Sequence, residues 1–401
     1  MAEPAQDGHA ARTGPVLLAL VAGQLGMHAA MAGLRMAAPL QTLREGASPW
    51  AVGLLLALFA AAPVLIALPA GRLADRLGYH RPVYLAVALS VAGGLLAIAS
   101  TQVGGGWRFA LLCGGAMATG SGTNIGLLTI QRSAGLAARD NTERVRIFAW
   151  LGVAPPLANV IGPVSAGFVI DAWGFGAAFA LLALLPLATL VSARYVPRLA
   201  PAATVAVPPG RRAWDLLQAP GIKRLFVVNW LLSMCWDVHT FAVPVLGHEL
   251  GFRAATIGLI LGSFTLSVTL VRAAIPALAH RLSEVLVLRV AMAATGAVFA
   301  LYPFATLPWV MGLLALLLGL SLGSVQPMVM SMLHQLTPEH RHGESLALRS
   351  MLMNMSSAAM PLLFGAVGTL VGASLLFWAV GAAVVGGSWL ASGLAPPEER
   401  R

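Results

Sequence analysis

The chain consists largely of apolar runs, each about twenty residues long, which is the length a helix needs to cross the ~30 Å hydrocarbon core of a membrane. Only 10% of its 401 residues are charged, whereas a soluble domain carries about 25%. So few charges cannot cover a water-facing surface. The alternating segments of about ten residues that mark membrane β-barrels do not occur. The sequence therefore predicts an all-α integral membrane protein.

We count twelve apolar runs, six on each side of a polar stretch. Their bounds are 14–35, 50–71, 82–101, 108–131, 147–170, 175–193, 224–247, 254–275, 285–303, 308–333, 346–370 and 373–393. The polar stretch is rich in proline and contains the pair Arg211-Arg212, as expected of a linker. We therefore predict two six-helix bundles, 1–194 and 223–401, joined by a cytoplasmic linker at 195–222. A short interfacial helix is expected at 214–217.

The net charge of +10 follows the predicted topology. If the N-terminus is cytoplasmic, 20 of the 25 Lys and Arg residues lie in cytoplasmic segments or at their edges. This is the positive-inside pattern, and we interpret the basic excess as a topology signal and not as nucleic-acid binding. We expect a monomer in the bacterial inner membrane with both termini in the cytoplasm. The first run is too long for a signal peptide, and the two cysteines, both inside apolar runs, form no disulfide framework.

A charged segment, Gly-Arg-Leu-Ala-Asp-Arg-Leu-Gly, follows the second run at 71–78, and a degenerate copy follows the eighth run at 276–283. A gap-free comparison of 52–77 with 257–282 gives nine identities in 26 positions. Some of these are chance matches between common residues, but their placement favours duplication. Parallel repeats of six helices are one architecture of membrane transporters, with the substrate site between the halves.

The segment at 71–78 resembles the loop motif G-x-L-a-D-r-x-G-r-k of the major facilitator superfamily. The matching positions are Gly71, Leu73, Ala74, Asp75, Arg76 and Gly78. Tyr79 and His80 replace the expected basic pair, and Arg81 follows one position late. The resemblance implies that Asp75 and the neighbouring arginines form a gating loop that locks the cytoplasmic side closed in one state. The simpler interpretation is a solvated loop, which gives Asp75 no role.

Small residues in the fifth run resemble a second motif, G-x8-G-x3-G-P-x2-G-G, carried there by exporters of the same superfamily. The matching positions are Ala149, Ala158, Gly162, Pro163, Ala166 and Gly167. Such residues let helices approach closely in lipid, which is also the general packing interpretation. The resemblance implies export by proton antiport.

Ionisable residues inside the membrane are costly, and each is therefore a functional candidate. Asp237, in the seventh run beside Trp236, is the carboxylate that we place deepest, and a desolvated carboxyl group can load and release a proton near neutral pH. A structural hydrogen bond is the alternative. His28, in the first run, is either a second proton carrier or a neutral packed histidine.

Further candidates are polar groups that could contact a substrate. Arg35 and Arg272 lie within runs and could bind an anion, although both could instead extend to the headgroups. Asn124, Asn229 and Gln326 are uncharged polar residues in the fourth, seventh and tenth runs. By resemblance, the fourth and tenth helices face a central cavity.

Together these features predict a secondary active transporter that works by alternating access and exports a small organic compound or drug in exchange for protons. The alternatives are uptake of an organic anion, transport of copper by clustered methionines, and a membrane receptor that transports nothing. No phosphate-binding loop or catalytic motif occurs, so we expect neither an enzyme nor ATP drive, and no cofactor or metal site. The expected partners are a small-molecule substrate, protons and the lipid bilayer.

Overall fold

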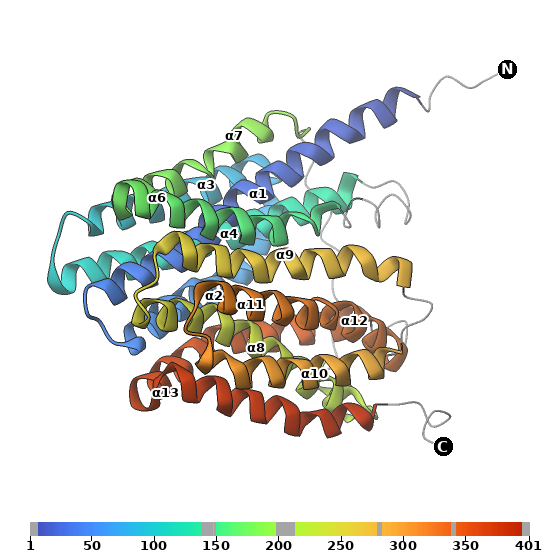
Figure 1. Cartoon of the computed structure of the whole chain (residues 1–401). Helices are drawn as coiled ribbons and strands as arrows, with labels where there is room; N and C mark the ends of the chain where they lie inside the picture. The colour runs from blue at the N-terminus through green and yellow to red at the C-terminus, as the bar shows by residue number, and fades with distance from the viewer. Residues whose placement is uncertain are drawn as a thin grey trace. The chain divides into compact units, whose positions relative to one another are not determined.

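The computed structural model describes residues 7–137, 147, 150–197, 213–278, 283–337 and 342–394, and these ranges contain helices and turns but no β-strand (Figure 1). The α-helices are α1 (Asp7–Arg44), α2 (Pro49–Leu77), α3 (His80–Ser100), α4 (Gly105–Ala137), α6 (Ala154–Leu184), α7 (Leu187–Ala193), α8 (Ile222–Glu249), α9 (Ala254–Leu278), α10 (Glu284–Leu301), α11 (Pro308–Gly323), α12 (Val325–Leu336) and α13 (His342–Ser392). Two short 3-10 helices are η1 (Ala213–Gln218) and η3 (Tyr302–Phe304). The expected short helix before the seventh run is confirmed as η1.

Ten helical segments of the described chain are long and apolar enough to cross a membrane. One of them, Ala154–Ala193, contains two predicted spans, because the backbone leaves helical geometry at Gly174, whose φ is 83°. The helix α4 is long enough at 33 residues, but its glycine, serine, threonine and asparagine residues make it less apolar than the ten. With these two additions, the described residues account for all twelve predicted spans.

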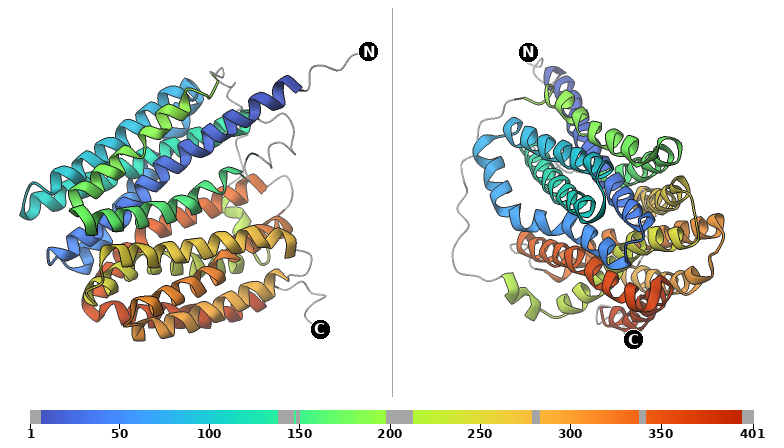
Figure 2. Two further views of the ribbon diagram at one scale, coloured as in Figure 1. Left: turned by 45° about the horizontal axis from the view of Figure 1, so that its top comes forward. Right: turned by 90° about the vertical axis from the view of Figure 1, so that its left-hand side faces the viewer.

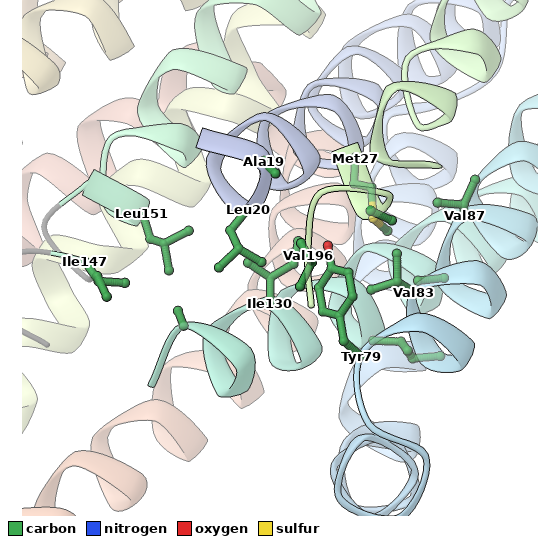
Figure 3. Packing of buried hydrophobic residues seen from close by; sticks show 14 residues of the cluster. Ala19, Leu20, Met27, Tyr79, Val83, Val87, Ile130, Ile147, Leu151 and Val196 are labelled. Carbon is green, nitrogen blue, oxygen red and sulfur yellow. The ribbon is translucent and has the colours of Figure 1, made fainter. Parts of the chain in front are cut away.

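The first compact unit comprises residues 1–41 and 58–206. In it, α3 packs against α4, α6 and α7. Buried side chains of α1, α3 and α4 pack together with Val196, which follows α7. Figure 3 shows Tyr79 among them. The close approach of α2 to α4 depends on Gly120, where a methyl group would meet the carbonyl oxygen of Phe59.

The second unit comprises residues 42–57 and 207–401. Here α9 lies beside α11, and α13 lies beside both α8 and α10 (Figure 2). A hydroxyl group joins the first pair, because Ser267 Oγ donates to the carbonyl oxygen of Leu316 over 2.8 Å. A methyl group at Gly319 of α11 would meet the carbonyl oxygen of Phe264. The helix pair α9–α11 therefore repeats the packing of α2 on α4, as expected of a duplicated bundle.

Residues 42–57 belong to the second unit although they precede most of the first in sequence. The N-terminal part of α2 contacts α13, where the backbone N–H of Trp50 donates to Thr369 Oγ1 over 3.1 Å. A methyl group at Gly53 would meet the carbonyl oxygen of Pro361. The helix α2 thus runs from one compact unit into the other. Most of the predicted linker lies outside the described residues.

The gating loop expected at 71–78 is shorter than the sequence suggested. The helix α2 continues through Gly71 to Leu77, so only the end of the motif leaves the helix. Gly78 makes this turn with a φ of 70°, a conformation that other residues rarely adopt. In the second copy, α10 follows Ser283, whose φ of −83° and ψ of 124° are extended. Residues 279–282 lie outside the described part.

Candidate functional site

The helices α1 and α4 of the first unit both carry buried polar atoms that have no hydrogen-bond partner among the described residues. The two helices approach each other where a methyl group at Gly126 would meet the end of the Met27 side chain. Four of these atoms are Gln24 Oε1 and His28 Nδ1 on α1, and Thr123 Oγ1 and Asn124 Oδ1 on α4. Buried polar atoms are nearly always satisfied in folded proteins. A hydrogen-bonding substrate or water is therefore the natural partner of this group.

His28 and Arg35 both lie on α1, seven residues and about two helical turns apart. Both side chains are partly exposed.

Asp237 lies in the middle of α8 in the second unit and is 6% exposed. Of the acidic side chains that the structure describes, it alone is buried. Its neighbour Trp236 packs edge-on against Phe264 of α9, with ring centroids 4.6 Å apart. The residue beside the carboxylate therefore packs α8 against α9.

His239, two residues after Asp237, forms a buried pair with Tyr302 that the sequence did not reveal. The hydroxyl group of Tyr302 lies 3.1 Å from His239 Nδ1, and both side chains are fully buried. The Tyr302 ring stacks on Phe377 at 4.5 Å and an interplanar angle of 12°. His239 Nε2 is buried and has no hydrogen-bond partner among the described residues. Tyr302 lies at the end of an apolar run, and no spacing rule pairs it with the seventh run.

Asn229 of α8 and Arg349 of α13 meet in the second unit. Asn229 is 2% exposed, and its Oδ1 accepts a hydrogen bond from Arg349 over 3.4 Å. Its Nδ2 donates to Met353 Sδ over 3.0 Å. Arg272 of α9 is partly exposed, and its Nε atom, like that of Arg349, is buried without a hydrogen-bond partner among the described residues. We missed Arg349 as a candidate, although its position inside the run 346–370 marks it as an intramembrane charge.

The gating-loop candidates are only partly described. Gly78 is buried at the turn and Arg81 is exposed, while the side chains of Asp75 and Arg76 lie outside the described part of the structure. Tyr79 and His80 hold the turn in place. Tyr79 is 2% exposed within the cluster of Figure 3, and His80 Nε2 lies 3.2 Å from the carbonyl oxygen of Ala193.

The small residues predicted as a packing motif lie on α6 against α1. Gly162, Pro163 and Gly167 are all buried. A methyl group at Gly162 would meet the carbonyl oxygen of Ala29 and would lie 2.7 Å from the backbone nitrogen of Gly33. The two backbones therefore meet without side chains between them.

The remaining candidates do not form one group. Gln326 is exposed on α12, and His28 and Asp237 belong to different compact units. In the described part of the chain, no three His, Cys, Asp or Glu side chains are grouped so that they could hold a metal ion.

Comparisons with known proteins agree over nearly the whole chain. The sequence model of the Major Facilitator Superfamily matches residues 20–225 and 225–401. The tetracycline resistance protein, class G, of Vibrio anguillarum is 29% identical over 330 residues, which are 79% of this chain and 80% of that protein. A crystal structure of a POT family transporter with a thioalcohol-conjugated peptide superposes with a TM-score of 0.76 at 13% identity, covering 93% of this chain and 94% of that one. Another, with 5-aminolevulinic acid, has the same coverage and identity and a TM-score of 0.74. At this identity the two structures show the fold alone.

Proposed function

Because the chain belongs to the Major Facilitator Superfamily, we propose that this multi-pass transporter exports a small organic compound in exchange for protons. The superfamily match spans both halves of the chain. The similarity to a tetracycline resistance protein supports a drug or drug-like substrate and the outward direction. We place the protein in the bacterial inner membrane with both termini in the cytoplasm, as the positive-inside pattern favours.

The buried carboxylate of Asp237 carries the proposal for proton coupling. An ionisable group inside a membrane helix is retained for a function in most proteins, since its burial is costly. A carboxyl group at this depth can take a proton from one side and release it to the other as the protein changes conformation. His28 is the second candidate, on the opposite half of the duplication.

The proposed substrate contacts are Asn124 and its unpartnered neighbours on α1 and α4, with Trp236 as an aromatic surface in the second half. These groups are mostly uncharged, which suits a compound that binds by hydrogen bonds and stacking. In the proposed cycle the two halves rock about this region, so that it opens to one side at a time.

The test begins with a growth screen of a deletion strain and an overexpressing strain against antibiotics, solvents, metals and organic acids. The first compound that separates the strains is then supplied to proteoliposomes with an imposed pH gradient. We expect the wild-type protein to accumulate it against its gradient, and Asp237→Asn to lose that accumulation. Glu249→Gln, an exposed acid on the same helix, is the matched control. Accumulation by the Asp237→Asn protein at the wild-type level would exclude Asp237 as the coupling residue, and accumulation without a pH gradient would exclude proton drive.

Transport of an organic anion is a second candidate, favoured by the buried Nε atoms of Arg272 and Arg349, which have no hydrogen-bond partner among the described residues. The sequence predicts Arg35 and Arg272 as the residues that bind the anion. Replacement of both by glutamine with no loss of anion transport would exclude it.

A further inference from the structure

The membrane segment Pro308–Leu336 contains a break, and its two parts have different neighbours. The helix α11 ends at Gly323, and α12 begins at Val325. Pro327, in the first turn of α12, has no N–H group to donate to a carbonyl oxygen of α11. The helix α11 lies beside α9 and α10, whereas α12 lies beside α10 and α8. The 12 residues of α12 therefore need contacts of their own to hold their position.

Glu284, the first residue of α10, makes such a contact with α12. Glu284 Oε1 accepts a hydrogen bond from Ser331 Oγ over 2.8 Å and another from Gln335 Nε2 over 3.0 Å. Gln335 Nε2 also donates to Ser331 Oγ over 3.3 Å, so the three side chains all bond one another. Ser331 and Gln335 are four residues apart and lie on one face of α12. Hydrogen bonds to a carboxylate are stronger than those between neutral groups, so these bonds tie α12 to α10.

The first copy of the repeat has an apolar contact at the same place. Continued by two positions, the alignment of the copies pairs Tyr79 with Glu284. Tyr79 directly precedes α3, just as Glu284 begins α10. The side chain of Tyr79 is buried in an apolar cluster that includes Ile130 of α4. Apolar packing is thus enough to hold this part of a bundle together, and the carboxylate of the second copy indicates a further role.

The helix α12 carries Gln326, a candidate substrate contact that is exposed although it lies inside a predicted span. Lipid offers no hydrogen-bond partner to an amide group, so an exposed amide in a span indicates a water-filled passage. We propose that Glu284 is a positioning residue: through Ser331 and Gln335 it sets the direction of α12 and thereby places Gln326 in the substrate passage. The link to the substrate rests on the proposed function, whereas the hold on α12 does not.

The position of α12 is measured by distances between pairs of spin labels on the purified full-length protein in nanodiscs, with both native cysteines replaced by alanine. The first pair joins the exposed positions Trp389→Cys of α13 and His334→Cys of α12. The control pair joins Trp389→Cys to the exposed Leu320→Cys of α11. We expect Glu284→Leu to widen the distance distribution of the first pair and to leave the control pair unchanged. Glu284→Gln keeps the shape of the side chain but not its charge, and it should widen the first distribution less.

Two results of this experiment would overturn the proposal. If Glu284→Leu leaves the first distribution unchanged, α12 holds its position without the carboxylate. If both distributions widen equally, Glu284 supports the whole bundle and not α12 in particular. Glu249→Leu, which removes an exposed acid from α8, should change neither distribution. Ser331→Ala removes one donor to Glu284 and provides the same test should Glu284→Leu fail to fold.

The link to the substrate is tested with the compound that the growth screen identifies. Gln326→Ala should raise the KM for transport, and the increase should be about tenfold larger in the wild-type background than in Glu284→Leu, where α12 no longer presents the amide group. Equal increases in the two backgrounds would overturn this link. A wild-type protein that transports no compound would contradict the proposed function instead, and the spin-label distances, which need no substrate, would still decide whether Glu284 holds α12.

Discussion

The contact between α6 and α1 predicts opposite effects of the same substitution at two glycines. Gly162 of α6 faces the backbone of α1, where an added methyl group would lie 2.7 Å from the nitrogen of Gly33 and closer still to the carbonyl oxygen of Ala29. Gly312 of α11 has open space, with nothing within 4 Å of the same position. Both residues are in helices, so Gly→Ala at either one gains the same helix propensity, about 1 kcal/mol.

The structure sets the balance at each site. At Gly312 only the gain remains, so Gly312→Ala should stabilise the protein by about 0.5–1 kcal/mol. At Gly162 the methyl group meets backbone atoms that cannot rotate away, and overpacking of this kind costs about 1–3 kcal/mol. Subtraction of the propensity gain from the upper part of that range leaves a net loss of about 1–2 kcal/mol for Gly162→Ala. For a unit of this size, that loss lowers the melting temperature by about 3–6 °C.

The assay uses the native cysteines of the purified protein. Cys235 is fully buried and Cys113 is partly buried, so a thiol-reactive fluorophore reports unfolding as the temperature rises. We expect the melting curve of Gly162→Ala to shift down and that of Gly312→Ala to shift up. A Gly162→Ala protein as stable as the wild type would show that α6 and α1 do not approach as closely as described.

Two tyrosine variants test other parts of the molecule, with the exposed Tyr195→Phe as their common control. Tyr302→Phe removes the hydroxyl partner of the buried His239 and should lower the free energy of unfolding by about 1–3 kcal/mol. The same melting assay measures this loss, and an unchanged melting curve would contradict the hydrogen bond. Burial raises the pKa of the Tyr79 hydroxyl above its ordinary value of 10.0, so the folded state holds this proton more tightly than the unfolded state. The contribution of this hydroxyl group to the free energy of unfolding is therefore fully present below pH 10 and decreases as the pH rises further. Tyr79→Phe should reduce this loss of stability at alkaline pH. A variant with the same pH profile as the wild type would exclude Tyr79 as its cause.

The fold could be predicted because membrane insertion constrains the sequence directly. Each span needs about twenty apolar residues, so the twelve runs were visible without any knowledge of packing. The predicted loop at 71–78 was too long, because Gly71 at its start does not break α2, whereas Gly78 ends the helix with its positive φ. Membership of residues 42–57 in the second unit was not predictable, since it depends on contacts with residues more than 300 positions away.

The candidate sites were predicted less completely, because spacing within one helix does not show which residues meet across helices. Asp237 and Asn229 were found as polar residues in apolar runs, and both are buried. Tyr302, the partner of His239, and Arg349, the partner of Asn229, come from runs far away in sequence. The roles assigned to these residues stay predictions until the variants are measured.

The duplication separates positions that hold the scaffold from positions that differ between the copies. Phe59 and Phe264 are equivalent in the two copies and both are buried, and the carbonyl oxygen of each lies where a glycine of a neighbouring helix allows close approach. The same alignment places Arg272 opposite Ala67 and Asp75 opposite His280. Of these positions, the ones that differ between the two copies carry a charged residue in one copy, and the one that is identical in both carries a buried aromatic residue. It follows that substitutions at the shared positions should change stability first, whereas substitutions at the diverged positions should change binding and transport while the bundles stay folded.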